Sequence, residues 1–193
     1  MAALGFTVSS GVTSTGNIVV SGGTGIVQSG GTASLTTIDS GGTETVFSGG
    51  AAVSATISSG GVLQDLGTTT GTIISNGASE IISSGGIASG TTFGGGGAQL
   101  VMGTASGTLV TSLGADLIEN GGVAIGTVVF NGGEETVAFG GGGGTAIGTT
   151  LSAGGDLFLS SGGTLSAAII SSGGQVFVQG GTAPRNDDQQ RWE

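Results

Sequence analysis

Pairs of adjacent glycines recur at regular intervals along this chain, and they constrain its fold more than any other feature. The first five pairs begin at Gly22, Gly30, Gly41, Gly49 and Gly60, so the intervals alternate between 8 and 11 residues. One full unit therefore spans 19 residues, and further pairs continue as far as Gly181 with small changes in spacing. A fixed period of this kind is typical of proteins that stack one structural unit many times.

Other positions of the unit repeat as well, counted from the first glycine of each pair. In the longer halves the seventh position is mostly Thr, the fourth is mostly Ala, and the sixth is Gly in six of nine units. In the shorter halves the sixth position is Val, Ile or Leu, except at Asp65. The ninth position of the longer halves is apolar in every unit and predicts a core column of Val19, Ile38, Ile57, Ile74, Phe93, Val110, Val129, Leu151 and Ile170.

These columns favour short strands separated by glycine corners. The seventh and ninth positions differ by two, which is the strand period, and β-branched residues suit strands. Helices are disfavoured, because each Gly in a helix interior costs about 1 kcal/mol relative to Ala. The sequence therefore predicts an all-β, single-domain parallel β-solenoid, with three strands per turn and about nine turns. A right-handed, three-sided β-helix is expected, since parallel crossovers are nearly always right-handed.

The composition excludes several classes of function. The chain contains 46 Gly but no Cys and no His, and its only cationic residues are Arg185 and Arg191. Zinc and iron–sulfur sites, a Ser-His-Asp triad and a phosphate-loop lysine are therefore ruled out. A net charge of −10 disfavours nucleic acid and anionic membranes as partners. We expect no enzymatic activity, no cofactor and no metal.

The acidic residues form a possible exception, because several share one column. The fourth position of the shorter halves contains Gly25, Glu44, Leu63, Glu80, Gln99, Asp116, Glu135, Leu157 and Val176. Strand alternation turns this column toward the interior, but burying charge is costly. We therefore expect a bend that exposes the column to solvent near a corner. The alternative is a cation that bridges the stacked carboxylates, although the Gly-Gly-x-Gly-x-Asp pattern of calcium β-rolls is absent.

The seven Phe residues are distributed over different columns, and we expect them to fill the core rather than form a stacking surface. Glu134 and Glu135 are adjacent in sequence, so a strand would point them to opposite faces and disfavour paired acid–base chemistry. The glycine run from Gly140 to Gly144 is expected to be an insertion at a corner.

Two segments carry a resemblance to a known family. Ser84 to Phe93 (SGGIASGTTF) and Gly121 to Val129 (GGVAIGTVV) resemble the passenger repeats of AIDA-type self-associating autotransporter adhesins, and the pattern extends over about Leu4 to Gly181. The resemblance implies a right-handed β-helix, display on the bacterial surface or secretion, and a role in aggregation, biofilm formation or adhesion. It also implies O-linked heptosylation at the Ser-Gly-Gly corners, which here are Ser29, Ser40, Ser48, Ser59, Ser84, Ser161 and Ser172.

The two ends of the chain leave several functions open. We expect a repeat domain over residues 1–182 and a polar tail or cap over 183–193, in which Pro184 stops strand pairing. The first six residues do not have the pattern of a signal peptide. The favoured hypothesis is a non-enzymatic surface or secreted solenoid that binds itself, and its further partners are a host or bacterial surface. The alternatives are a filament subunit that stacks end to end and a spacer within a longer protein.

Overall fold

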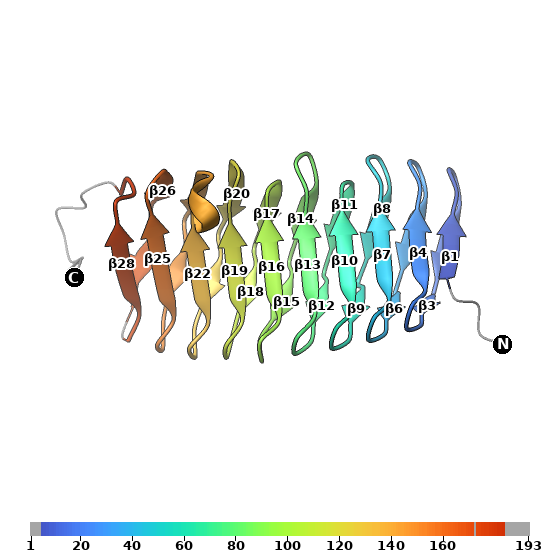
Figure 1. Ribbon diagram of the computed structural model, residues 1–193, viewed down its shortest axis with the longest axis horizontal. Helices are drawn as coiled ribbons and strands as arrows, with labels where there is room; N and C mark the ends of the chain where they lie inside the picture. The colour runs from blue at the N-terminus through green and yellow to red at the C-terminus, as the bar shows by residue number, and fades with distance from the viewer. Residues whose placement is uncertain (1–4, 172, 184–193) are drawn as a thin grey trace.

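The computed structural model describes residues 5–171 and 173–183. These residues form a parallel β-solenoid in which each turn, here called a rung, passes through three sheets (Figure 1). The strands of the front sheet run upward, and the chain descends behind them while it advances from right to left, so the winding is right-handed (Figure 1). The all-β, three-sided solenoid of about nine rungs is confirmed.

The three sheets contain only parallel strand pairs between named strands. Sheet A consists of β1 (Gly5–Val8), β4 (Thr24–Val27), β7 (Thr43–Val46), β10 (Val62–Asp65), β13 (Ser79–Ile82), β16 (Ala98–Val101), β19 (Ala115–Ile118), β22 (Glu134–Val137), β25 (Asp156–Ser160) and β28 (Gln175–Gln179). Sheet B consists of β2 (Thr13–Thr15), β5 (Thr32–Ser34), β8 (Ala51–Val53), β11 (Thr68–Thr70), β14 (Ile87–Ser89), β17 (Thr104–Ser106), β20 (Gly122–Ile125), β23 (Gly144–Ile147) and β26 (Gly163–Ser166). Sheet C consists of β3 (Ile18–Val19), β6 (Thr37–Ile38), β9 (Thr56–Ile57), β12 (Ile73–Ile74), β15 (Thr92–Phe93), β18 (Leu109–Val110), β21 (Val128–Val129), β24 (Thr150–Leu151) and β27 (Ile169–Ile170). A 3-10 turn, η1 (Phe139–Gly141), lies at the corner where the glycine run was expected.

The glycine pairs are explained by two different constraints. The first glycine of a pair has a positive φ, as at Gly30, where φ is 74°, and L side chains rarely adopt that conformation. The second glycine packs against the previous rung, because a Cβ on Gly31 would lie 2.7 Å from the carbonyl oxygen of Val8. The pair therefore turns the chain and lets successive corners approach closely.

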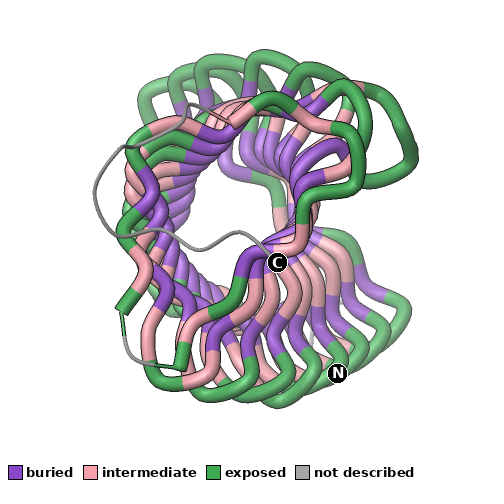
Figure 2. Tube along the Cα trace, turned by 90° about the vertical axis from the view of Figure 1, so that its left-hand side faces the viewer, coloured by how far each residue is buried: buried purple, intermediate pink, exposed green. Residues whose placement is uncertain are grey.

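In the interior, the equivalent residues of successive rungs stack on one another along each sheet. Successive ninth-position residues pair in register in sheet C, as Val19 does with Ile38 and Ile38 with Ile57. All nine of these residues line the interior, and only Ile170 in the last rung is partly exposed. Figure 2 shows the buried residues on the inner side of the coil, viewed along its axis. Each buried aliphatic side chain contributes about 1.5–3 kcal/mol.

Apolar side chains occupy the interior at both ends of the described solenoid. Phe6 lies over Gly25, where an added Cβ would be 2.7 Å from the Phe6 ring. At the other end Leu157 and Val176 are buried in the same column. Val178, which follows Leu159 in its column, is 40% exposed. The tail from Pro184 onward, for which a cap was expected, lies outside the described residues.

Replacing Ile57 with Asp tests the register of this core. Ile57 is fully buried between Ile38 and Ile74, which offer no hydrogen-bond donor to a carboxylate. We expect Ile57→Asp to lower the melting temperature by more than roughly 10 °C, because an unpaired buried carboxyl costs several kcal/mol. Circular dichroism melting measures this shift. Thr56→Asp on the same strand points outward and should change the melting temperature little; equal melting of both variants would contradict the register.

Candidate functional site

The acidic column of sheet A lies inside the solenoid. Glu44, Glu80, Asp116 and Glu135 are each 0% exposed, and so is Asp65 from the neighbouring column. The expectation of a solvated column near a corner was therefore wrong. Strand alternation holds through sheet A and turns these side chains inward, as the sequence pattern by itself indicated. Hydrogen bonds offset the free-energy cost of burying these acids in one part of the rod and are missing in others.

Glu80 occupies a fully hydrogen-bonded part of the interior. Its Oε1 accepts hydrogen bonds from the hydroxyls of Thr69 at 2.9 Å and Thr72 at 3.1 Å. Its Oε2 accepts from the hydroxyl of Thr91 at 2.9 Å and from Nε2 of Gln99 at 2.8 Å. Four donors thus surround one carboxylate, which is the condition under which a buried acid is tolerated.

The groups next to Glu80 extend this network. The Asp65 carboxylate accepts a hydrogen bond from the backbone N–H of Gly67 at 2.9 Å and a longer one from Thr69 at 3.4 Å. On the other side, the hydroxyl of Thr108 donates to Oε1 of Gln99 at 3.1 Å. The seventh-position Thr column thus supplies three of the donors, Thr72, Thr91 and Thr108, a role that sequence analysis did not assign to it. The sequence did contain a signal for this role, because strand alternation places both the Thr column and the acidic column on the inward-facing side.

Three other carboxyl groups in the interior have no hydrogen-bond partner. Neither oxygen of Glu44, Asp116 or Glu135 makes a hydrogen bond. The hydroxyls of Thr127 and Thr149, which belong to the same rungs as Asp116 and Glu135, are unpaired as well. Residues 5–171 and 173–183 contain no Lys, Arg or His that could neutralise these acids. The interior therefore contains acceptors without matching donors.

Burial changes the proton affinity of these acids. It raises the pKa of Glu44 to about 7, opposed by the hydroxyl of Thr36, which nevertheless falls outside hydrogen-bond geometry. Burial also raises the pKa of Asp65 to about 7, with repulsion from Glu80 adding to the effect and the N–H of Gly67 opposing it. These carboxyls hold their protons more tightly in the folded chain than in the unfolded chain.

Asp116 and Glu135 interact directly. Burial raises the pKa of Asp116 well above its usual range, and repulsion from Glu135 and then Glu80 raises it further. Burial raises the pKa of Glu135 to about 7, opposed by the nearby hydroxyls of Thr149 and Thr127. Glu134 points to the opposite face and is partly exposed, as the alternation of the strand requires.

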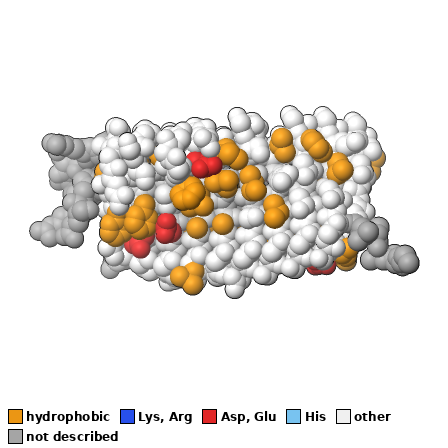
Figure 3. All heavy atoms as spheres, viewed as in Figure 1, with side chains coloured by type: hydrophobic (Ala, Val, Ile, Leu, Met, Phe, Trp, Pro, Cys, Tyr) orange, Lys and Arg blue, Asp and Glu red, His pale blue; other side chains and the backbone are white. Residues whose placement is uncertain are grey.

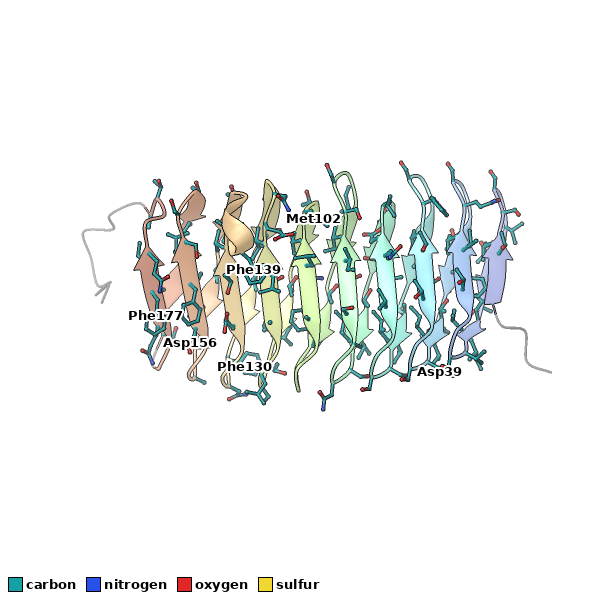
Figure 4. The ribbon with its side chains drawn as sticks, in the orientation of Figure 1. Asp39, Met102, Phe130, Phe139, Asp156 and Phe177 are labelled. Atoms are coloured by element: carbon teal, nitrogen blue, oxygen red, sulfur yellow. The ribbon has the colours of Figure 1, made fainter. Side chains whose placement is uncertain are left out.

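The outer face of sheet A carries a column of residues that are apolar except for Thr136. In-register pairing stacks Ile81, Leu100, Leu117, Thr136, Phe158 and Phe177 on six successive strands. The rings of Phe158 and Phe177 stack with centroids 4.8 Å apart. Figure 3 shows apolar side chains gathered on this face, with acidic groups beside them toward the C-terminal half. Figure 4 shows Asp156 and Phe177 on the neighbouring strands β25 and β28.

The expectation that the Phe residues fill the core was wrong for most of them. Phe93 is the one fully buried Phe in the described residues, whereas Phe47 and Phe139 are each 46% exposed. Phe158 and Phe177 occupy the strand position between two inward columns, so alternation places them outside. The same parity that identified the core therefore also identifies this outer column.

The serines of the Ser-Gly-Gly corners form two exposed rows. Six of the predicted positions are exposed, and the seventh, Ser172, lies outside the described residues. At three of these corners a glycine of the next rung lies close to the hydroxyl. An added Cβ on that glycine would lie 2.5 Å from Oγ of Ser29, 3.1 Å from Oγ of Ser40 and 3.4 Å from Oγ of Ser59.

Two other kinds of feature are absent from the described residues. No group of three or more His, Cys, Asp or Glu in this part of the chain is arranged to hold a metal ion. No helix in it is long and apolar enough to cross a membrane.

The fold and the repeat can be compared with known proteins. No protein-family model matches the chain, and no curated protein does. Among solved structures, the crystal structure of a TibC-catalysed, hyper-glycosylated fragment of TibA, residues 55–350, is similar, with a TM-score of 0.89 and 39% sequence identity. The alignment covers 93% of this chain and 66% of the fragment, which is just under two thirds of its length.

The three-sheet solenoid and its 19-residue spacing are consistent with AIDA-type repeats. The resemblance that the Ser-Gly-Gly and Gly-Thr columns indicated is thus confirmed at the level of the repeat and its fold. The repeats of this chain combine an acidic interior with a largely apolar outer column on one sheet.

The buried carboxyls predict how stability depends on pH. The pKa of Glu44 is about 7 in the folded chain against 4.5 for a free side chain, so the folded state binds the proton more tightly. The free energy of unfolding should be highest below about pH 4.5, fall as the pH rises to about 7, and level off above that. Glu44→Gln should remove part of this slope and stabilise the rod at pH 8 by on the order of 3 kcal/mol.

Chemical denaturation at several pH values, in the presence of a chelator, measures this dependence. Asp39→Asn, at a partly exposed corner position, is the matched control and should keep the wild-type slope. A stability that rises with pH between 5 and 7, or a Glu44→Gln variant with an unchanged slope, would contradict the assignment.

Proposed function

We propose that this chain is a non-enzymatic adhesive solenoid, located on the bacterial surface or secreted, that associates with itself side by side. The observation that carries the proposal is the apolar column on the outer face of sheet A, from Ile81 to Phe177. The five apolar residues of this column are partly exposed, and apolar side chains gathered on one face commonly mark interaction surfaces. The similarity to the TibA fragment supports the adhesive class.

The shape of this surface suits a second copy of the same rod. Six rungs at a spacing of about 4.8 Å make a straight strip about 24 Å long. A straight, repetitive strip is complementary to another strip of the same period, whereas it offers no pocket for a small ligand. Two copies would therefore pair sheet A against sheet A.

The charges beside the column favour one orientation of the pair. Glu134 and Asp156 flank it at the C-terminal half, on β22 and β25. At the N-terminal half of the column, the corresponding positions are Ser79, Ala98 and Ala115. An antiparallel arrangement keeps the acids of the two copies apart, while a parallel one would place like charges opposite each other at a cost. The proposed pair is therefore antiparallel.

A charge introduced into the column tests the proposed association. Leu117 lies near the middle of the strip and points outward, so Leu117→Glu should leave the fold intact. We expect it to weaken self-association at least tenfold, because the new carboxylates would be buried against an apolar surface. Sedimentation velocity over a range of concentrations measures the association, and clumping of cells that display the chain reports its consequence.

Ile125→Glu is the matched control, since Ile125 is an exposed apolar residue of sheet B at 42% exposure. That variant should associate like the wild type. A wild-type rod that stays monomeric at high concentration, or equal loss in both variants, would contradict the proposed surface. The alternative is an end-to-end filament, which electron microscopy distinguishes from side-by-side pairs. Such filaments would appear as fibres one rod wide, and Leu117→Glu would not abolish them.

We also propose that the exposed Ser-Gly-Gly corners accept sugars. The structural neighbour is a hyper-glycosylated fragment modified by TibC, and six corner serines of this chain are exposed beside glycines. Attached sugars would lie along the corners and leave the outer face of sheet A free.

Co-expression with TibC tests this modification. We expect the intact mass to rise in regular steps of one sugar, with the modified peptides containing the corner serines. Ser29→Ala should remove one site, whereas Ser34→Ala, in strand β5, should not change the pattern. An unmodified chain, or sugars attached mainly to strand residues, would argue against these positions.

A further inference from the structure

Six oxygen atoms without partners lie together in one part of the interior. They are both carboxylate oxygens of Asp116, both of Glu135, and the hydroxyl oxygens of Thr127 and Thr149. Asp116 pairs directly with Glu135 across β19 and β22, which places the two carboxyls on neighbouring rungs. All four residues are 0% exposed.

The hydroxyls of Thr127 and Thr149 lie near the two acids. The Thr127 hydroxyl is near enough to influence both Asp116 and Glu135, and the Thr149 hydroxyl influences Glu135. Neither hydroxyl has another partner. The contrast with Glu80 is geometric. There, Thr and Gln side chains donate four hydrogen bonds, whereas here the hydroxyls of Thr127 and Thr149 lie outside hydrogen-bond geometry.

The surroundings offer no internal compensation. Along sheet A the pair is bordered by Gln99 on one side and by Leu157 on the other, and Glu80 is the next charged group. Sheet B contributes Ala124 and Ala146 to the same rungs. The described residues include no cationic side chain that could neutralise the two acids.

We propose that Asp116, Glu135, Thr127 and Thr149 form a calcium site inside the solenoid. Hard cations bind oxygen ligands, and Ca²⁺ takes six to eight of them in flexible geometry. Two carboxylates balance the charge of one divalent ion, and the hydroxyls complete the oxygen set. The site contains only two acidic ligands, which distinguishes it from clusters of three or more acids.

Calcium fits this site better than magnesium does. Mg²⁺ requires a nearly ideal octahedron and retains several waters. The interior is lined here by Leu157 and by Ala side chains, which offer no hydrogen bonds to a hydration shell. The ion would enter while the rungs close around it, so uptake is coupled to folding.

The test uses the full chain, unfolded and refolded in calcium chloride or in a chelator at pH 8. We expect one Ca²⁺ per chain by native mass spectrometry and elemental analysis. We also expect a melting temperature roughly 5–10 °C higher with calcium than with chelator. Protons compete for the same carboxylates, so the difference should shrink at pH 5.

Isosteric amides provide the matched variants. Asp116→Asn combined with Glu135→Gln should fold without calcium, because its amides supply donors, and should lose both the bound ion and the calcium-dependent shift. Glu44→Gln removes a buried, unpaired carboxyl elsewhere in the interior and should keep both. The proposal is overturned if the wild type retains no calcium and melts identically in chelator, or if the double amide variant keeps the shift. In the first case the pair holds protons in place of an ion.

Discussion

Every residue of this solenoid has the equivalent residue of the next turn directly above it, at a spacing of about 4.8 Å. Backbone pairing enforces this stacking, because the strands of all three sheets are in register over the described rungs. Stacking like on like is favourable for Val and Ile, which exclude water together. It is unfavourable for carboxylates, which repel one another. The stability and the surface of the rod therefore depend on whether the side chains of each column can be stacked at this spacing without repelling one another.

The apolar columns could be predicted from the sequence because periodicity determines them. A residue that repeats every 19 positions, two positions from another repeating residue, shares a face with it, and this placed Ile38 and Ile57 correctly. The glycine corners were predictable for the same reason, although Leu35 and Ser54 occupy positive-φ positions where six units have Gly. Strain at isolated corners is tolerated because neighbouring rungs hold the backbone in place.

The polar interior could not be predicted with the same rule, because two arguments disagreed. Alternation placed Glu44 and Glu135 inside, while the cost of burying charge placed them outside. The decision depended on partners that periodicity does not identify, such as Thr91 and Gln99 around Glu80. For the aromatic residues, the prediction followed hydrophobicity where it should have followed strand alternation. Hydrophobicity suggested that Phe158 and Phe177 belong in the core, and alternation, which placed them outside, was correct.

The irregular members of the acidic column provide something that identical repeats lack. Nearly equal rungs can pair one turn out of register at little cost, since the apolar columns would still match. The interior order Glu44, Leu63, Glu80, Gln99, Asp116, Glu135, Leu157 does not repeat. A slip by one rung would place Leu63 among the Thr donors of Glu80 and would move Glu80 away from Gln99. Because an acid without its donors is costly to bury, the polar interior favours a single register.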